Sequence, residues 1–267
     1  LSIRRQRQMC IRDSYYNDDN KVRTNRVTLM SESLTSSEKS LKFINEFDFT
    51  SDKNKIKLTL FSNYILNYVF ERPIGIYGTV RGPMPYFIFD QNDVLFVGSD
   101  LTVKKEFTKK FNSSITLNYF WSKNLENNGN LINQPPVRIE NNLIWKTNNF
   151  WKINFSEISL SPSYSFKQSQ APITISPEDL INGVVNITPE TNIFDFKDAP
   201  DGHFLLDFSW RLKLNDFSAS INVNNVLNTS YRNYLNSMRY FADEIGRNFI
   251  INFSYTCLLY TSDAADE

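Results

Sequence analysis

The sequence predicts an all-β protein, built as an antiparallel up-and-down transmembrane β-barrel. Two observations carry this prediction. Apolar and polar residues alternate with a period of two in nine separate segments, as in strands that have one apolar and one polar face. The connections between these segments alternate between short and long along the chain, which is typical of barrels with tight turns at one membrane surface and long loops at the other.

The two ends of the chain resemble translated sequencing-adapter DNA and are set apart from the fold. Met9 to Ser14 can be encoded by ATG TGT ATA AGA GAC AG, and the reverse complement, in a shifted frame, encodes Cys257 to Thr261. We therefore interpret residues 1–14 and 257–267 as adapter-derived and expect them to be disordered. Both cysteines lie in these ends, so the native chain is expected to lack cysteine. Residues 15–38 are expected to form a loop or an incomplete strand.

Charge and hydropathy exclude several classes of protein. Removing the ends takes away four basic and four acidic residues, so the remaining charge stays balanced and gives no indication of a nucleic-acid partner. No segment reaches the roughly 18 apolar residues that a membrane helix needs. An aromatic content of 15%, with 22 Phe, is unusual for a soluble domain but suits strands that alternate apolar and polar residues in a membrane.

The strand segments differ in how clearly they alternate. In chain order they are 39–50, 55–71, 85–108, 113–123, 137–147, 150–167, 203–214, 217–228 and 247–256. The seventh is the clearest, since every second residue from Phe204 to Leu214 is apolar, and the second and eighth repeat this pattern. In the sixth the apolar parity changes between Phe155 and Ile158, which predicts a β-bulge near Ser156-Glu157.

The connections support the barrel over a soluble sandwich. The short ones are 51–54, 109–112, 148–149 and 215–216, and the long ones are 72–84, 124–136, 168–202 and 229–246. A soluble sandwich has no reason to keep that order. Aromatic residues near strand ends suit the girdle at a membrane interface, where a ring lies partly in lipid and partly in water. The alternative is the aromatic core of a soluble all-β binding module.

The order of several short motifs resembles a known family. The segment 223–234 (VNNVLNTSYRNY), then Gly246-Arg247-Asn248 and the alternating residues 249–256, resemble the last two strands of a TonB-dependent outer-membrane receptor of the kind common in Bacteroidota. Ser37–Ser40, Val97–Leu101 and Pro135–Asn141 resemble earlier strand starts of the same family. Each match is weak alone, whereas their order and spacing are specific.

The resemblance implies that the chain is the C-terminal part of a larger protein. Plugged outer-membrane transporters have about 22 strands, so about nine strands make up less than half of such a barrel. The signal peptide, TonB-binding box, plug and earlier strands would precede Leu1. Residues 39–256 would then be barrel, closed by a last strand whose outward residues are Phe249, Ile251, Phe253 and Tyr255.

The family also implies a function without covalent chemistry. Such a receptor imports a scarce ligand, here most naturally an iron–siderophore or another metal chelate, with energy from the TonB complex. It lies in the outer membrane of a Gram-negative bacterium, contacts lipid, depends on the barrel-assembly machinery for insertion, and needs no cofactor. A passive porin, a glycan importer and a soluble all-β binding module remain alternatives.

Candidate ligand-binding residues are the Arg and aromatic residues of the long loops, because these groups can bind an anionic chelate by charge-assisted hydrogen bonds and stacking. They are Arg72, Tyr77, Arg81, Phe194, Tyr231, Arg232, Tyr234, Arg239 and Tyr240. The alternative for each is an ordinary solvated loop residue. His203, the single histidine, sits at a strand start and is interpreted as a rim residue, since a metal site needs several ligands together.

Overall fold

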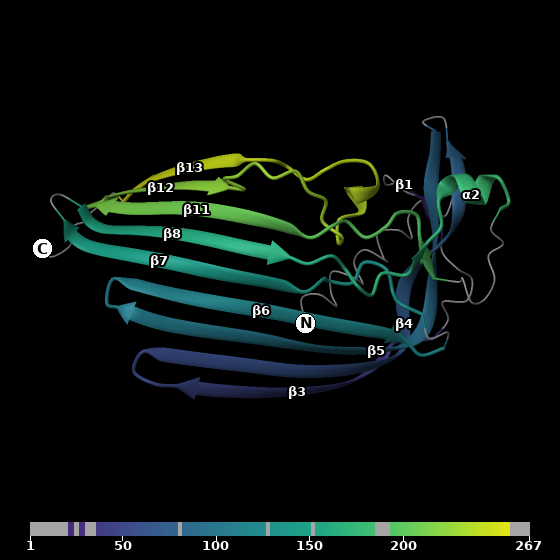
Figure 1. Ribbon diagram of the computed structural model, residues 1–267, viewed down its shortest axis with the longest axis horizontal. Coiled ribbons are helices and arrows are strands. Elements are labelled where there is room, and N and C mark those ends of the chain that lie inside the picture. Colours follow the sequence, from purple (N-terminus) through teal and green to yellow (C-terminus); the bar gives the residue numbers. More distant parts are fainter. Residues whose placement is uncertain are drawn as a thin grey trace, which may run out of the picture.

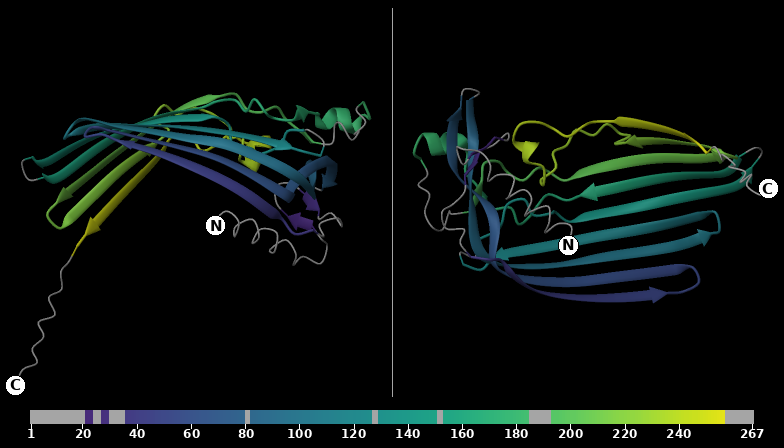
Figure 2. Two further views of the ribbon diagram at one scale, coloured as in Figure 1. Left: turned by 90° about the horizontal axis from the view of Figure 1, so that it is seen from below. Right: turned by 180° about the vertical axis from the view of Figure 1, so that it is seen from behind.

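The computed structural model describes residues 21–23, 27–29, 36–79, 82–126, 129–150, 153–184 and 193–256. The predicted adapter ends, 1–14 and 257–267, lie outside the described residues, as does Arg81. Most of the described chain forms one curved antiparallel sheet, here called the wall, with loops gathered at one end (Figures 1 and 2).

Nine strands of the described chain make up the wall, and each corresponds to a predicted segment. They are β3 (Lys39–Thr50), β4 (Asn54–Thr79), β5 (Gly82–Thr108), β6 (Phe111–Asn124), β7 (Arg138–Phe150), β8 (Ile153–Ser165), β11 (His203–Leu214), β12 (Phe217–Asn224) and β13 (Asn248–Tyr255). Each pairs antiparallel with its neighbours in chain order, and β8 pairs with β11. The predicted all-β up-and-down fold is therefore confirmed.

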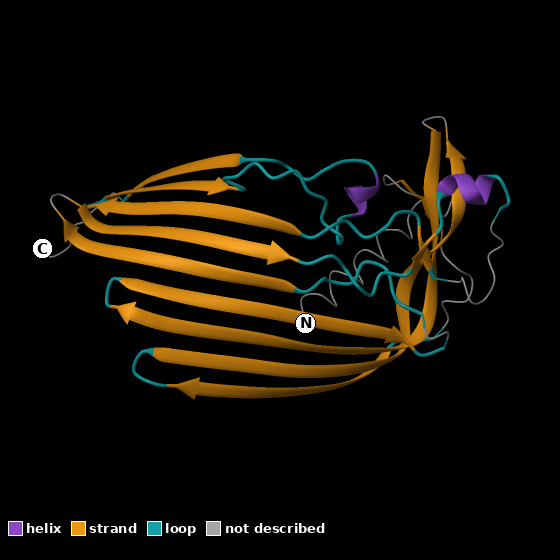
Figure 3. Cartoon of the chain, in the orientation of Figure 1, coloured by secondary structure: helices purple, strands orange, loops and turns teal. Residues whose placement is uncertain are grey.

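Smaller elements lie mainly at the end of the wall where the long connections are. They are β1 (Lys21–Arg23), β2 (Val27–Leu29), β9 (Ile173–Thr174), α2 (Pro177–Ile181), β10 (Phe194–Asp195) and the 3-10 helix η3 (Ser237–Tyr240). We call this the loop end and the opposite one the turn end. Figure 3 shows both helices at the loop end. Neither helix of the described chain is long and apolar enough to cross a membrane.

The strand register gathers the apolar residues on one face of the wall. In one row, Phe208 pairs with Leu160 on β8 and Val223 on β12. Similar rows run from β3 to β13. Apolar residues alternate with a period of two in every strand, and each strand is paired so that its apolar residues lie opposite those of its neighbours. The side chains on this outer face are largely exposed, including Phe43 at 60% and Phe253 at 71%. The predicted closing residues Phe249, Ile251, Phe253 and Tyr255 lie on it, in β13.

The opposite face, here called the inner face, is mainly polar. Asp207, Ser209 and Arg211 lie on it, next to serines of β8 and β12. Glu157 of β8 is buried there and pairs with Arg211 of β11 and with Lys146 of β7, 3.4 Å away. Side chains that would be solvated on a soluble sheet thus bind each other across strands on the inner face.

The bulge predicted near Ser156-Glu157 is wrong. β8 pairs with β11 in one continuous register from Phe155 to Ser165, and its pairing with β7 keeps one register as well. Ile153 and Phe155 lie on the inner face with Glu157, while Ile158 lies on the outer face. The apolar residues of β8 therefore move from the inner face before Glu157 to the outer face after it, and no residue is inserted in the strand.

The prediction of a loop over 72–84 is also wrong, because β4 and β5 continue as a paired hairpin as far as Thr79 and Gly82. The hairpin turns sharply away from the wall (Figure 1). The register shifts between Ile65 and Tyr68, where Asn67 has φ 54°. The Asn67 amide N–H donates to Asp93 Oδ1 at 3.0 Å. A bulge with a left-handed Asn, fixed by a carboxylate on the partner strand, thus makes the corner.

The apolar core of the described chain lies at the loop end. It joins Phe87 of the hairpin, Leu131 and Ile132 of the loop 125–137, Phe194 and Phe196 around β10, and Tyr240 of η3. Phe196 packs edge-on against Phe87 and Phe194, with ring centroids 5.7 and 5.4 Å apart. We call this packed group of loops and hairpin the cap. The cap is folded like a small soluble domain, whereas the wall exposes its apolar residues.

Candidate functional site

The loop between β12 and β13 begins with a turn made by two asparagines. Asn225 and Asn228 have φ angles of 51° and 55°, a conformation that Asn tolerates better than most residues. The Asn225 amide N–H donates to Asp207 Oδ1 at 2.7 Å, and the Asn225 side chain exchanges hydrogen bonds with the Thr229 backbone. The predicted strand end at 228 therefore moves back to Asn224, where β12 stops.

The same turn holds the other end of this loop. Asn228 Oδ1 accepts a hydrogen bond from the Arg247 amide N–H at 2.9 Å. A Cβ on Gly246 would lie 2.7 Å from that oxygen, so any larger residue would have to displace the Asn228 side chain. The Asn225–Asn228 turn and the Gly246-Arg247 pair therefore hold the two ends of the loop together. We call these residues the clasp, and it positions Ser230, Tyr231 and Arg232.

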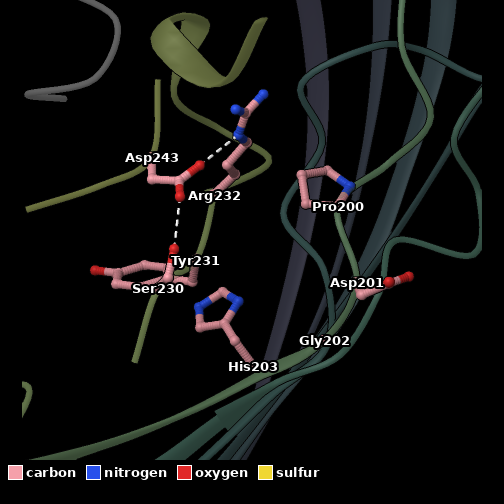
Figure 4. Close-up of a pocket in the computed structure, with 8 residues that line it drawn as sticks. All are labelled: Pro200, Asp201, Gly202, His203, Ser230, Tyr231, Arg232 and Asp243. Atoms are coloured by element: carbon pink, nitrogen blue, oxygen red, sulfur yellow. Dashed lines mark hydrogen bonds and ion pairs between the residues drawn. The ribbon is translucent and has the colours of Figure 1, made fainter. Parts of the chain in front are cut away.

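A cleft of about 290 Å³ opens between this loop and the start of β11 (Figure 4). It is lined by Pro200, Asp201, Gly202, His203, Ser230, Tyr231, Arg232 and Asp243. Asp243 accepts hydrogen bonds from Ser230 Oγ at 2.5 Å and Arg232 Nε at 2.7 Å. The Ser230 hydrogen bond, and then that of Arg232, hold the pKa of Asp243 below its ordinary value. The cleft therefore keeps a fixed, ionised carboxylate beside a guanidinium.

The floor of the cleft is aromatic. The rings of His203 and Tyr231 stack with centroids 4.4 Å apart and planes 30° apart. Burial raises the pKa of the Tyr231 hydroxyl, and the carboxylates of Glu244 and Asp207 add to this. Arg138 of β7 lies in the same cross-strand row as His203, with Ser165 between them. The inner face thus brings a second guanidinium towards the cleft.

Behind the cleft, a buried ion pair ties two loops of the cap together. Arg239 Nη2 lies 2.5 Å from Asp195 Oδ2, and their side chains are 1% and 2% exposed. Tyr240 donates its hydroxyl to Asp195 Oδ1 at 2.7 Å. The Arg239 guanidinium also lies over the rings of Tyr234 and Tyr240, 4.5 and 4.4 Å from the ring centroids. Burial raises the pKa of Tyr234 to about 12.

The ion pair is connected directly to the cleft. Arg232 Nη1 donates to the backbone carbonyl of Arg239 at 2.8 Å, while its Nε holds Asp243. Lys197 Nζ donates to the carbonyl of Tyr240 at 2.7 Å. The cleft wall therefore rests on a buried, hydrogen-bonded support.

The structure divides the predicted site residues into three groups. Tyr231 and Arg232 line the cleft. Phe194, Tyr234, Arg239 and Tyr240 are buried in the cap, behind it. Arg72 lies in the β4 hairpin and pairs with Asp90 at 2.8 Å, and Tyr77 lies in β4 as well. Only the first group faces the cleft, and the binding role of every candidate stays a prediction.

Sequence reasoning did not select His203 and Arg138 as binding residues, although the structure places them at or near the cleft. Both residues begin strands of the wall. They could have been placed together from the strand register, because β7, β8 and β11 pair without a shift and both residues lie opposite Ser165. Within the described chain, no three His, Cys, Asp or Glu residues are grouped to hold a metal ion. The cleft combines guanidinium, carboxylate and aromatic groups, which suit non-covalent binding of a polar ligand.

Several solved structures share this fold. The copper transporter OprC superposes with a TM-score of 0.61 at 14% identity, over 82% of this chain and 31% of that chain. The siderophore receptor PirA from Acinetobacter baumannii gives 0.55 at 14% identity, over 82% and 32%. The FrpB iron transporter (F3-3 variant) from Neisseria meningitidis gives 0.57 at 13% identity, over 86% and 33%.

This chain spans about a third of the length of those proteins. No family model and no curated protein matches it. Because the identities are low, the likeness concerns the fold. The chain therefore has the antiparallel barrel-wall fold that is found in these transporters and receptors of metals and siderophores.

Proposed function

We propose that the chain is part of the wall and outer loops of a TonB-dependent outer-membrane receptor of a Gram-negative bacterium. In this proposal the receptor imports a scarce ligand, an iron–siderophore or another metal chelate, with energy from the TonB complex. The protein is a transporter component and carries out no covalent chemistry. TonB and the plug would act through regions that the family places before the barrel, and the assembly machinery through the closing strand.

The single observation that carries the membrane location is the continuous apolar face of nine strands. Leaving one large apolar side chain in water rather than burying it costs about 1.5–3 kcal/mol, and many such residues lie on this face at 36–71% exposure. Lipid would cover all of them at once. A soluble all-β module would place this face in its core, whereas the apolar core of the described chain lies in the cap.

The loop end supports the binding part of the proposal. The cleft residues Arg232 and Tyr231, with Arg138 nearby, offer guanidinium groups and an aromatic ring to a metal chelate. Both guanidinium groups are also paired, Arg232 with Asp243 and Arg138 with Glu140, so a ligand would share them with these carboxylates. A preformed cap also favours selective binding, because ordered loops lose less entropy when they bind. A passive porin would gain nothing from such a buried support, so the active receptor is preferred to the porin.

A matched pair of substitutions tests the membrane location. Phe208 faces outward and its neighbour Ser209 faces inward. We expect Phe208→Arg to lower the stability of the chain in bilayers by about 2–4 kcal/mol, and Ser209→Arg to change it little. The measurement is urea unfolding of the full chain refolded into phosphatidylcholine vesicles. Equal effects of the two substitutions would contradict the membrane location.

A binding assay tests the ligand class. The probes are ferric tris-catecholate and ferric tris-hydroxamate chelates, measured by quenching of protein fluorescence in the refolded chain. We expect Tyr231→Ala with Arg232→Gln to weaken binding at least tenfold. Arg247→Gln is the control. Arg247 lies in the same loop, and its hydrogen bond to Asn228 uses the backbone amide, which the substitution keeps. Binding that is unchanged in the double variant would remove the cleft from the proposal.

A further inference from the structure

The turn end of the wall carries a concentrated positive charge that the import function does not use. Residues 51–57 and 104–110, which meet where β4 pairs with β5, contain seven lysines against Asp52 and Glu106. Lys57 is matched by Glu46 at 3.2 Å. By contrast, the β11–β12 turn consists of Asn215 and Asp216. The charge is densest in this stretch of the rim, around the β5–β6 turn, although Lys146 and Lys213 lie near the two other turns.

Aromatic rings on the outer face lie directly beside these lysines. Phe107 stacks on Phe111 with centroids 5.3 Å apart, and Phe111 contacts Trp145 at 6.4 Å. Phe107 and Trp145 are 47% and 59% exposed. The register shifts between Glu106 and Thr108, so Phe107 is the extra residue of a bulge. The bulge thus supplies an additional ring at the height where the wall ends.

The lysines are held at the same height as the rings. Lys105 follows the apolar parity of Val103 onto the outer face, and its Nζ lies 5.2 Å from the centroid of Phe107. Thr108 Oγ1 accepts hydrogen bonds from the amides of Lys110, at 3.2 Å, and Phe111, at 3.0 Å. This fixes the turn that presents Lys109 and Lys110. A cation above rings of this kind matches the boundary between acyl chains and headgroups.

We propose that the β5–β6 turn is a binding site for the phosphate headgroup of an anionic phospholipid in the leaflet at the turn end. Lys105, Lys109 and Lys110 bind the phosphate, and Phe107, Phe111 and Trp145 pack on the first acyl carbons. The proposal rests on the membrane location proposed above and adds a specific lipid partner to it. Lys105 faces outward by register and Lys109 and Lys110 lie in the turn, whereas Lys55, Lys57 and Lys104 face inward. The three lysines at the outer face and turn match a negative lipid surface in charge, which distinguishes the site from a general aromatic girdle.

The test uses the full chain refolded in mixed micelles of phosphatidylcholine with one fifth phosphatidylglycerol. Lipid that remains bound after purification is quantified by mass spectrometry, and far-ultraviolet circular dichroism reports the β-sheet. We expect phosphatidylglycerol to be enriched several-fold over its supplied fraction. Lys105→Gln with Lys109→Gln and Lys110→Gln should return the bound phosphatidylglycerol to about its supplied fraction, because each lysine near an anionic surface contributes roughly fivefold to lipid binding and all three are removed.

A second triple variant gives the matched control. Lys39→Gln, Lys42→Gln and Lys167→Gln remove the same charge near the loop end of the wall, and the enrichment should persist. Equal loss in both variants would overturn the site in favour of general charge attraction. Added inorganic phosphate should leave the lipid bound, since it cannot use the rings, and displacement by it would also overturn the site. A chain that shows the same β-sheet signal in buffer without lipid or detergent would instead refute the membrane location itself.

Discussion

Removing Asp195 tests whether the buried ion pair supports the cap. Within the described residues, Arg239 forms an ion pair with one carboxylate, that of Asp195, and its Nε and Nη1 make no hydrogen bond. Asp195→Ala would leave this guanidinium buried and unpaired, and would also remove the acceptor of the Tyr240 hydroxyl. Breaking a buried pair from one side costs about 3–5 kcal/mol. Since each 1.4 kcal/mol is about tenfold, local opening should become roughly two to four orders of magnitude more frequent.

Amide hydrogen exchange measures that opening where it occurs. The Ile175 amide donates to the Asp195 carbonyl at 2.9 Å, and the Phe241 amide donates to that of Met238 at 2.8 Å. Both should exchange faster in Asp195→Ala, while amides in β11 and β12 should keep their rates. Asp198→Ala, three residues away at an exposed site, is the control and should change little.

A double variant separates the lost pair from lost packing. Asp195→Leu with Arg239→Met replaces both charges by apolar groups of similar size, and such replacements of buried pairs are often neutral or stabilising. We expect exchange rates near those of the parent. The reasoning is refuted if the double variant opens as readily as Asp195→Ala, or if Asp195→Ala has no effect.

Three further predictions concern single residues. Asn67→Gly should preserve the corner of β4, whereas Asn67→Val should lower the free energy of unfolding by about 1–2 kcal/mol because a β-branched residue is strained at φ 54°. Urea unfolding of both variants measures this difference, and equal stability would contradict the role of Asn67 in the corner. Asp243 has a lowered pKa, so its contribution is present above the ordinary value of 3.8 and is lost as the pH falls through the lower folded value. The protection of the Glu244 amide, measured against its intrinsic exchange rate at each pH, should therefore fall in acid, and Asp243→Asn should abolish that fall. Tyr234 has a pKa raised from 10.0 to about 12, so its contribution is complete below pH 10.0 and is lost as the pH rises through about 12; phenolate absorbance should lack this late step in Tyr234→Phe.

The wall was predictable because its information is local. Alternation with a period of two identifies Phe204–Leu214 as a strand without knowledge of its partners, and register then follows from keeping one face apolar. The β4–β5 hairpin was missed because Pro73, Gly75 and Gly78 resemble a loop in sequence, while the pairing that makes them strands comes from residues 82–90. The parity change at Phe155–Ile158 could not distinguish a bulge from inward-facing apolar residues.

The site was predictable only in part, because the cap is held by contacts between distant segments. Asp195 and Arg239 are 44 residues apart in sequence, and no pattern along the chain joins them. Arginine and tyrosine occur in both parts of this loop. Tyr231 and Arg232 face the cleft, whereas Tyr234, Arg239 and Tyr240 are buried behind it. Burial, which decides between these roles, depends on packing that a single sequence does not display.

The corner in β4 has a mechanical consequence for the cap. β4 and β5 stay paired from the wall into the cap, apart from register shifts at Ile65–Tyr68 and Pro73–Gly75. Tilting this part of the cap would therefore break ladder hydrogen bonds on both sides of Asn67. The loop 225–247 is attached differently, by the clasp at its base and by the few side-chain bonds of Arg232, Arg239 and Lys197. Motion of the cap relative to the wall would therefore start in the loop 225–247, which lines the cleft, and not in the hairpin.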